Sequence, residues 1–140
     1  MVTIKSIMTK KVVTLASSAF VVTAAKAMTK NKVSCVIVTE RGIPIGMVTE
    51  RDITRKLVAK GKLASGVRVN TIMTTPLRTI DVDSDFMKAS TILKKYKIRR
   101  LPVLKAERLV GIVTQTDLLQ ASIHFIDGIA DKISSVVDNI

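Results

Sequence analysis

Two short segments of the sequence place a threonine three residues before an aspartate, Thr49 with Asp52 and Thr114 with Asp117. Each pair follows a predicted strand and opens a predicted helix. A helix N-terminus with a free hydroxyl attracts anions, because its first backbone N–H groups lack partners within the helix. A carboxylate one turn in accepts two hydrogen bonds from a vicinal diol such as ribose. The residue types and their spacing therefore favour an anion and a sugar as ligands.

The same residues also fit a purely structural role. A threonine at the N-cap with an acidic residue at position N3 forms a capping box, which satisfies unpaired N–H groups and complements the helix dipole. Sequence alone leaves both interpretations open for Thr49 with Asp52 and for Thr114 with Asp117.

These segments belong to a longer repeat. Ile7-Met8-Thr9 recurs as Ile72-Met73-Thr74, and GMVTERD from Gly46 to Asp52 recurs as GIVTQTD from Gly111 to Asp117. Both recurrences lie 65 positions apart, so the chain is a tandem duplication. Two similar units generally meet across a pseudo-two-fold axis, and the groove along that axis offers two related pockets. The repeated glycines allow close approach of another backbone.

The elements expected to position these residues follow one plan in each unit. The first unit predicts a strand at 12–15, a helix from Ser17 or Ser18 to 31, strands at 33–39 and 45–48, and a helix at 49–60. The second unit predicts a strand at 77–80, a helix capped by Ser84 or Asp85, strands at 101–104 and 109–113, and a final helix.

The final helix is predicted to extend past the repeat. It carries an apolar stripe at Ile123, Ile126, Ile129, Ile133 and Val137. Such a stripe packs either on its own domain, which is the commoner arrangement, or on a partner, most simply a second copy of the chain.

Composition limits the classes of protein. The 140 residues carry a net charge of +12, of which residues 1–65 hold +9 and residues 66–140 hold +3. This balance favours polyanions or phosphorylated ligands. A nucleic-acid binder is one such alternative, although the few aromatic residues disfavour a base-stacking surface. Cys35 and His124 are single residues of their kinds, so a zinc cluster is not expected. The chain lacks a long apolar run and a signal-like start, so we expect a cytoplasmic protein without a membrane span.

The order of these motifs resembles a known family. Ile-Met-Thr, a short strand, a helix, a strand ending in Arg99-Arg100-Leu101-Pro102-Val103, and then Gly-hydrophobic-Val-Thr-x-x-Asp are similar to the cystathionine β-synthase (CBS) domain. The resemblance covers residues 2–124, and two such domains in tandem form a Bateman module. It implies an α/β (α+β) fold of two βαββα repeats packed sheet to sheet with pseudo-two-fold symmetry. It also implies a cleft for AMP, ADP, ATP or S-adenosylmethionine, and a homodimer.

The resemblance also implies roles for individual residues. Asp52 and Asp117 match the ribose-binding acid, Thr49 and Thr114 match the phosphate-binding hydroxyl, and Arg99 and Arg100 match a basic pair that approaches phosphates. The positions that line the adenine are Thr9, Val13, Thr74 and Arg78. One pocket would then combine Asp52 and Thr49 with Thr74, Arg78, Arg99 and Arg100, while Arg51 is placed to add a cation to either pocket.

The pocket around Asp117, Thr114, Thr9 and Val13 is expected to lack the basic pair, because Ser34 and Cys35 stand at the equivalent positions. Cys35 itself is expected to be a small core residue and not a reactive thiol.

The sequence therefore predicts a repeat at 1–65, a second at 66–125 and a helical extension at 126–140. It predicts a regulatory module that binds an adenine nucleotide, requires no cofactor, and acts as a homodimer or through an effector protein. An enzyme is not expected, because no nucleophile and base stand together in the sequence.

Overall fold

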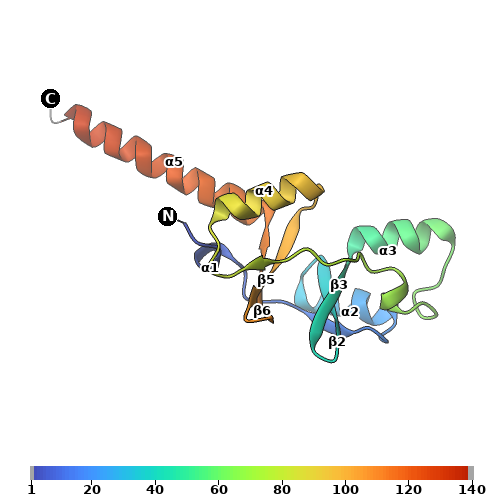
Figure 1. The fold of residues 1–140 in the computed structure, drawn as a ribbon. Coiled ribbons are helices and arrows are strands. Elements are labelled where there is room, and N and C mark those ends of the chain that lie inside the picture. The colour runs from blue at the N-terminus through green and yellow to red at the C-terminus, as the bar shows by residue number, and fades with distance from the viewer. Residues whose placement is uncertain (1, 139–140) are drawn as a thin grey trace.

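The computed structural model describes residues 2–138 as two three-stranded sheets with helices, a mixed α+β fold (Figure 1). Met1 of the predicted first repeat, and Asn139 and Ile140 of the predicted extension, lie outside the described residues. No helix among residues 2–138 combines the length and the apolar character that crossing a membrane requires.

The first unit contributes one sheet and its helices. Its elements are α1 (Ile4–Ile7), β1 (Thr14–Ala16), α2 (Val21–Asn31), β2 (Cys35–Glu40), β3 (Ile43–Thr49), α3 (Glu50–Lys56) and the 3-10 turn η1 (Val58–Lys60). In the sheet, β2 lies in the centre, parallel to β1 and antiparallel to β3.

The second unit repeats this arrangement. Its elements are the 3-10 turn η2 (Val69–Thr71), β4 (Ile80–Asp81), α4 (Phe86–Tyr96), β5 (Arg100–Lys105), β6 (Arg108–Thr114) and the long helix α5 (Gln115–Asp138). Helices α2 and α4, and strands β2 with β5 and β3 with β6, begin and end 65 positions apart. Even the irregularity in strand pairing recurs, between Val38 and Thr39 and between Val103 and Leu104. The predicted duplication and fold class are confirmed.

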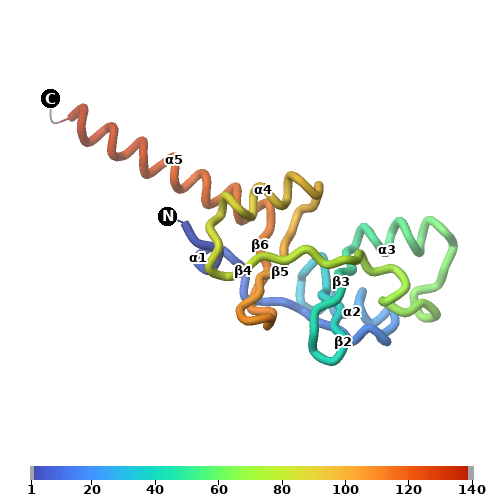
Figure 2. The backbone as a smooth tube through the Cα atoms, viewed as in Figure 1, coloured from blue at the N-terminus to red at the C-terminus, as the bar shows by residue number. Residues whose placement is uncertain are grey.

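The lead-in segments, residues 2–9 and 67–74, cross to the opposite unit. Ile4 is fully buried in the core that β4, β5 and α4 form, whereas Val69 and Ile72 are buried in the core of α2, β2 and β3. In Figure 2, α1 accordingly lies beside the second unit's sheet and away from α2. The predicted boundary at 65/66 divides the repeats in sequence, but in space each unit's core is completed by a segment of the other.

Two glycines make the crossing possible. Two backbone hydrogen bonds join Thr9 and Ile112, with N to O distances of 2.8 and 2.9 Å, and two join Met47 and Thr74, with distances of 3.2 and 2.8 Å. At Gly111 a Cβ atom would lie 2.7 Å from Met8 Sδ and 2.9 Å from the Thr9 carbonyl oxygen, so only glycine fits beside the crossing segment. At Gly46 a Cβ atom would likewise lie 2.5 Å from Met73 Sδ.

The same crossing explains where the prediction of a serine N-cap is wrong. Helix α2 begins at Val21 after Phe20, with no side-chain cap, because the chain entering the second unit satisfies its first N–H groups. Val21 N donates to the Val67 carbonyl (2.8 Å) and Val22 N to the Ala64 carbonyl (2.9 Å). For α4, the predicted alternative Asp85 is the cap, accepting from Lys88 N at 2.9 Å.

The short first strand of each unit also differs from its predicted range. Strand β1 begins at Thr14 and not at residue 12, and β4 comprises only Ile80 and Asp81 and not 77–80. Each is placed by parallel pairing with the central strand, which begins at Thr14 opposite Ile37 and at Ile80 opposite Val103. Long-range pairing of this kind overrides the local β-branched pattern.

Helix α5 reaches well beyond the second sheet (Figure 1). Leu118 and Ala121 are its only buried residues, and the stripe residues from Ile123 to Val137 are exposed. The interpretation that this stripe packs on its own domain is therefore wrong. Beyond Ser122 the described part of the helix projects away from the two sheets and buries no side chain.

Replacing Gly111 with alanine should lower the free energy of unfolding by about 1–3 kcal/mol, because the new methyl group displaces the Thr9 backbone. Urea unfolding of the purified protein measures the change. Gly128→Ala is the matched control, since a Cβ atom there meets nothing within 4 Å and alanine suits a helix better than glycine. A Gly111→Ala protein as stable as the wild type would show that the crossing is not tightly packed.

Candidate functional site

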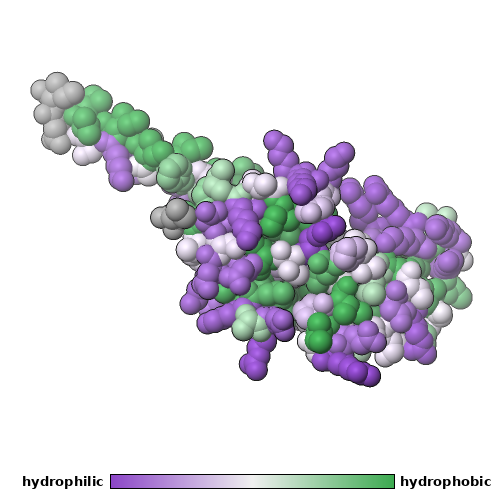
Figure 3. Space-filling model, in the orientation of Figure 1, coloured by the Kyte–Doolittle hydropathy of each residue, from purple (hydrophilic) through white to green (hydrophobic). Residues whose placement is uncertain are grey.

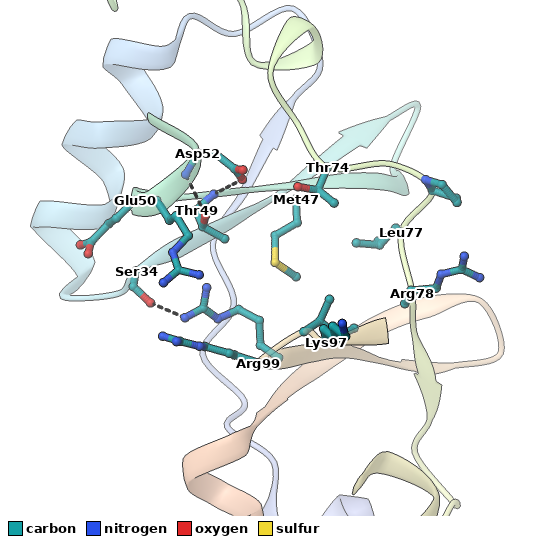
Figure 4. A pocket seen from close by; sticks show the side chains of 14 residues that line it. Ser34, Met47, Thr49, Glu50, Asp52, Thr74, Leu77, Arg78, Lys97 and Arg99 are labelled. Atoms are coloured by element: carbon teal, nitrogen blue, oxygen red, sulfur yellow. Dashed lines mark hydrogen bonds between the residues drawn. The ribbon is translucent and has the colours of Figure 1, made fainter. Parts of the chain in front are cut away.

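A cavity of about 370 Å³ opens between the two units and receives residues from both. We call it the first cavity, and Figure 4 shows it at close range. Its walls are Ser34, Met47, Thr49, Glu50, Arg51 and Asp52 from the first unit, and Thr74, Pro76, Leu77, Arg78, Lys97, Ile98, Arg99 and Arg100 from the second. The structure thus brings Thr49, Arg51, Asp52, Thr74, Arg78, Arg99 and Arg100 together, as the sequence predicts.

The polar end of the cavity is the N-terminus of α3. Thr49 N donates to Asp52 Oδ2 (2.9 Å), and Asp52 N donates to Thr49 Oγ1 (3.1 Å), which completes the predicted capping box. Asp52 Oδ1 also lies 3.2 Å from Lys56 Nζ, and the Asp52 side chain is only 13% exposed. Each carboxylate oxygen has two lone pairs, so the capping role leaves acceptor sites for a ligand. The two interpretations of this motif are therefore compatible.

Cations dominate the rest of the wall. Arg99 lies directly before β5 and across the cavity from Thr49 (Figure 4). Arg100 begins β5, and its Nη2 donates to Ser34 Oγ of the other unit at 3.0 Å. Basic side chains outnumber acidic ones by five to two around the cavity. An anion entering from solvent would thus meet a positive potential.

Arg78 lines the rim of the cavity while its guanidinium stacks on an aromatic ring. Its guanidinium lies 4.0 Å from the centre of the Tyr96 ring, and Figure 4 shows the side chain directed away from Thr49 and Asp52. This stacking arrangement stabilises Arg78 at the rim.

The sequence did not predict several residues of the cavity wall. Lys97 adds a cation, as the C-cap of α4 in the left-handed conformation (φ 54°), two residues before Arg99. Met47, Pro76, Leu77 and Ile98 provide an apolar surface suited to a flat heterocycle. The repeat offers one signal for these residues in the sequence. If the lead-in segments cross between the units, Met73-Thr74 contacts Gly46 and Met47, which places Met47 at the site.

A second cavity, of about 490 Å³, lies at the related position. The predicted residues Thr9, Val13 and Thr114 line it, but Asp117 does not. Asp117 forms its own capping box, accepting from Thr114 N at 2.9 Å. Asp117 therefore contacts Thr114, which lines the second cavity, but does not line the cavity itself.

The second cavity is also more basic than expected. Ser34 and Cys35 replace the arginine pair as predicted, but Arg100 reaches across and lines both cavities, and Lys11 and Lys32 add further charges. Comparing equivalent positions of the two repeats did not predict that Arg100 lines the second cavity, because Arg100 comes from the opposite unit.

Cys35 lies half-buried on the wall of the second cavity, and so it is not a fully buried core residue. Burial raises the pKa of its thiol, and the nearby Arg100 guanidinium partly opposes that rise. Among residues 2–138, no three His, Cys, Asp or Glu side chains gather in a way that would hold a metal ion.

Comparison with protein families finds the CBS-domain model at residues 4–59 and again at 69–124. The CBS domain-containing protein YhcV of Bacillus subtilis is 33% identical over 118 residues, which cover 84% of each chain. An uncharacterized protein of Methanocaldococcus jannaschii is 35% identical over 130 residues, covering 84% of this chain. The chain spans only 31% of that relative, and 55% of a Methanopyrus kandleri protein that is 34% identical.

Solved structures resemble the fold closely. A hexameric CBS-CP12 protein from bloom-forming cyanobacteria superimposes with a TM-score of 0.82 at 33% identity, covering 99% of this chain and 85% of that one. A CBS domain pair solved with 5′-methylthioadenosine and S-adenosyl-L-methionine gives a TM-score of 0.78 at 28% identity, covering 86% of this chain and 95% of that one.

Arg100→Gln should raise the pKa of Cys35 further, because it removes the charge that favours the thiolate. Only the thiolate reacts with iodoacetamide, so the pH at which alkylation accelerates should move upward from its already raised position. The inflection of the rate against pH is the measurement.

Arg108→Gln makes the same charge change at an exposed position away from this cavity and should leave the inflection in place. An unchanged inflection in Arg100→Gln would contradict the placement of Arg100 beside Cys35.

Proposed function

Because the chain belongs to the CBS-domain family and forms a CBS pair, a regulatory module, we propose that it binds an adenosine-containing ligand without catalysing a reaction. The observation that supports this most is the first cavity, which the Thr49–Asp52 helix start of one repeat lines together with Arg99 and Arg100 of the other. Its volume of about 370 Å³ falls within the range of small-molecule sites.

Each part of a nucleotide has a matching surface in the first cavity. The ribose diol is placed at the Asp52 carboxylate, whose burial strengthens charge-assisted hydrogen bonds. Phosphates are placed toward Arg99, Arg100 and Lys97, and the adenine against the apolar wall that includes Met47 and Leu77.

The charge of the cavity narrows the ligand class. A related CBS pair was solved with 5′-methylthioadenosine and S-adenosyl-L-methionine, which supports adenosine-type ligands in general. In this chain the excess of basic side chains favours an anionic ligand over the positively charged sulfonium of S-adenosylmethionine. We therefore propose AMP, ADP or ATP as the ligand of the first cavity.

The second cavity is proposed as a weaker site. It offers Lys11, Lys32 and Arg100 to a phosphate and Thr114 as a hydroxyl, but its acidic lining residue is Glu50, and neither Asp52 nor Asp117 lines it. Occupation of the two cavities should also be linked, because one guanidinium, that of Arg100, lines both.

Nucleic-acid binding remains the alternative that the charge of +12 favours. Two aromatic side chains that would offer stacking surfaces are already covered by arginines. Arg68 lies 4.6 Å from the centre of the Phe20 ring, and Arg78 lies 4.0 Å from that of Tyr96. Of the remaining rings Phe125 is 58% exposed, so the alternative rests mainly on phosphate contacts that carry no base preference.

We also propose that copies of the chain assemble, with a homodimer as the smallest unit. The resemblance to a CBS protein described as hexameric supports assembly in general. An effector protein that reads the ligand state fits a regulatory module of this kind.

Asp52→Ala should weaken AMP and ATP binding about 10- to 100-fold, because it removes charge-assisted bonds to the ribose. Isothermal titration calorimetry on the purified chain measures both ligands. Asp117→Ala is the matched control, since it also removes the acid of a capping box but leaves the first cavity intact.

Equal affinity in the wild type and Asp52→Ala would remove this carboxylate from the site. A second titration, of single-stranded oligonucleotides at two salt concentrations by gel shift, separates the alternative. Tight, steeply salt-dependent oligonucleotide binding with no saturable nucleotide binding would contradict the proposed function.

A further inference from the structure

The projecting part of α5 has an apolar surface that no other element within residues 2–138 covers. The large apolar side chains between Leu119 and Val137 are 43–64% exposed. Figure 3 shows them as a nearly continuous green edge along the projecting helix, with purple on the other side. A single helix in water gains little from propensity alone, so a helix that projects this far normally has a packing partner.

The spacing of these side chains identifies the kind of partner. One row advances in alternating steps of four and three residues, Leu119, Ile123, Ile126, Ala130, Ile133 and Val137. We call this row the C-terminal seam. Each position recurs after seven residues, Leu119 with Ile126 and Ile133, and Ile123 with Ala130 and Val137. Seven residues over two turns, or about 3.5 per turn, is the repeat that keeps one helix against another in a coiled coil. The large seam residues are 49–62% exposed, so all of them are available to a second helix.

The charged residues of this segment avoid the seam. Asp131 and Asp138 fall on the outer side of the helix, Asp127 flanks the seam, and Lys132 lies away from it. Two seams can therefore meet without placing like charges opposite each other at the centre of the contact. Coiled-coil pairing tolerates charges at such outer positions.

We propose that the C-terminal seam pairs with the same seam of a second copy of this chain. A second copy supplies the matching 3.5-residue repeat, and self-pairing needs no other partner. The inference deepens the proposed assembly by naming its surface, and it is independent of nucleotide binding.

The charge of the helix disfavours a membrane surface as the occupant. Helices that lie on anionic lipids carry Lys and Arg on their polar face. From Leu119 to Asp138 the charged residues are three aspartates and one lysine, whereas every other Lys and Arg of the chain lies outside this segment. A nucleic acid is disfavoured for the same reason.

Sedimentation velocity of the full chain over a concentration series tests the proposal. The variant Ile126→Asp with Ile133→Asp places charges at the centre of the seam and should weaken self-association at least about 100-fold. Both residues are exposed, at 62% and 58%, so the substitutions leave the cores of the two units untouched.

The matched control is His124→Asp with Phe125→Asp, which adds the same residues to the same helix outside the seam. A wild type that forms dimers or multiples of dimers, a dissociated seam variant and an associated control would support the proposal. If the wild type and the seam variant each self-associate equally well, the seam is not the contact surface, although the proposed assembly stands. A monomeric wild type would overturn both, while calorimetry of nucleotide binding would be unaffected.

Discussion

The exchange of lead-in segments between the two repeats is the constraint on which the rest of the structure depends. Ile4 is fully buried in the second unit's core, and Val69 is fully buried in the first unit's core. Burying one such side chain contributes about 1.5–3 kcal/mol. Separating the units would expose these residues and break the backbone hydrogen bonds between Thr9 and Ile112 and between Met47 and Thr74. Neither unit therefore has a complete core of its own.

The exchange also creates the candidate site. Because of the exchange, Thr74 pairs with Met47 of the first unit. Pro76, Leu77 and Arg78, which follow in the same segment, form one wall of the first cavity. The opposite helix start and the arginine pair complete it from the two repeats. A ligand bound there touches both units at once, so its binding energy acts on their relative placement. That is a physical basis on which a CBS pair can regulate.

Divergence within the duplication makes the two cavities unequal. The backbones repeat at 65 positions, but Arg99 and Arg100 correspond to Ser34 and Cys35, and Arg78 corresponds to Val13. Lys56, which lies beside Asp52, corresponds to Ala121, so Asp117 has no such cation one turn away. The symmetric scaffold thus presents one basic cavity lined by the half-buried Asp52 and a second basic cavity that neither Asp52 nor Asp117 lines.

The sequence predicted what depends on local pattern and on the repeat. The central strands and the capping boxes at Thr49 and Thr114 follow from apolar periodicity and matched motifs. The family resemblance implied the part of the first cavity that includes Asp52, Arg99 and Arg100. It did not predict what depends on contacts between distant segments. The start of α2 at Val21 is set by the Val67 carbonyl, and Arg100 enters the second cavity from the other repeat. The exposure of α5 likewise depends on where the body ends, which no local pattern records.

The central claim is that the two repeats together grip an adenine nucleotide in the first cavity. A crystal structure of the chain grown with AMP tests it most directly. We expect nucleotide density in that cavity, with the ribose hydroxyls at hydrogen-bonding distance from the Asp52 carboxylate and the phosphate beside Arg99 and Arg100. An empty first cavity at saturating AMP, with Asp52 contacting only Thr49 and Lys56, would contradict it.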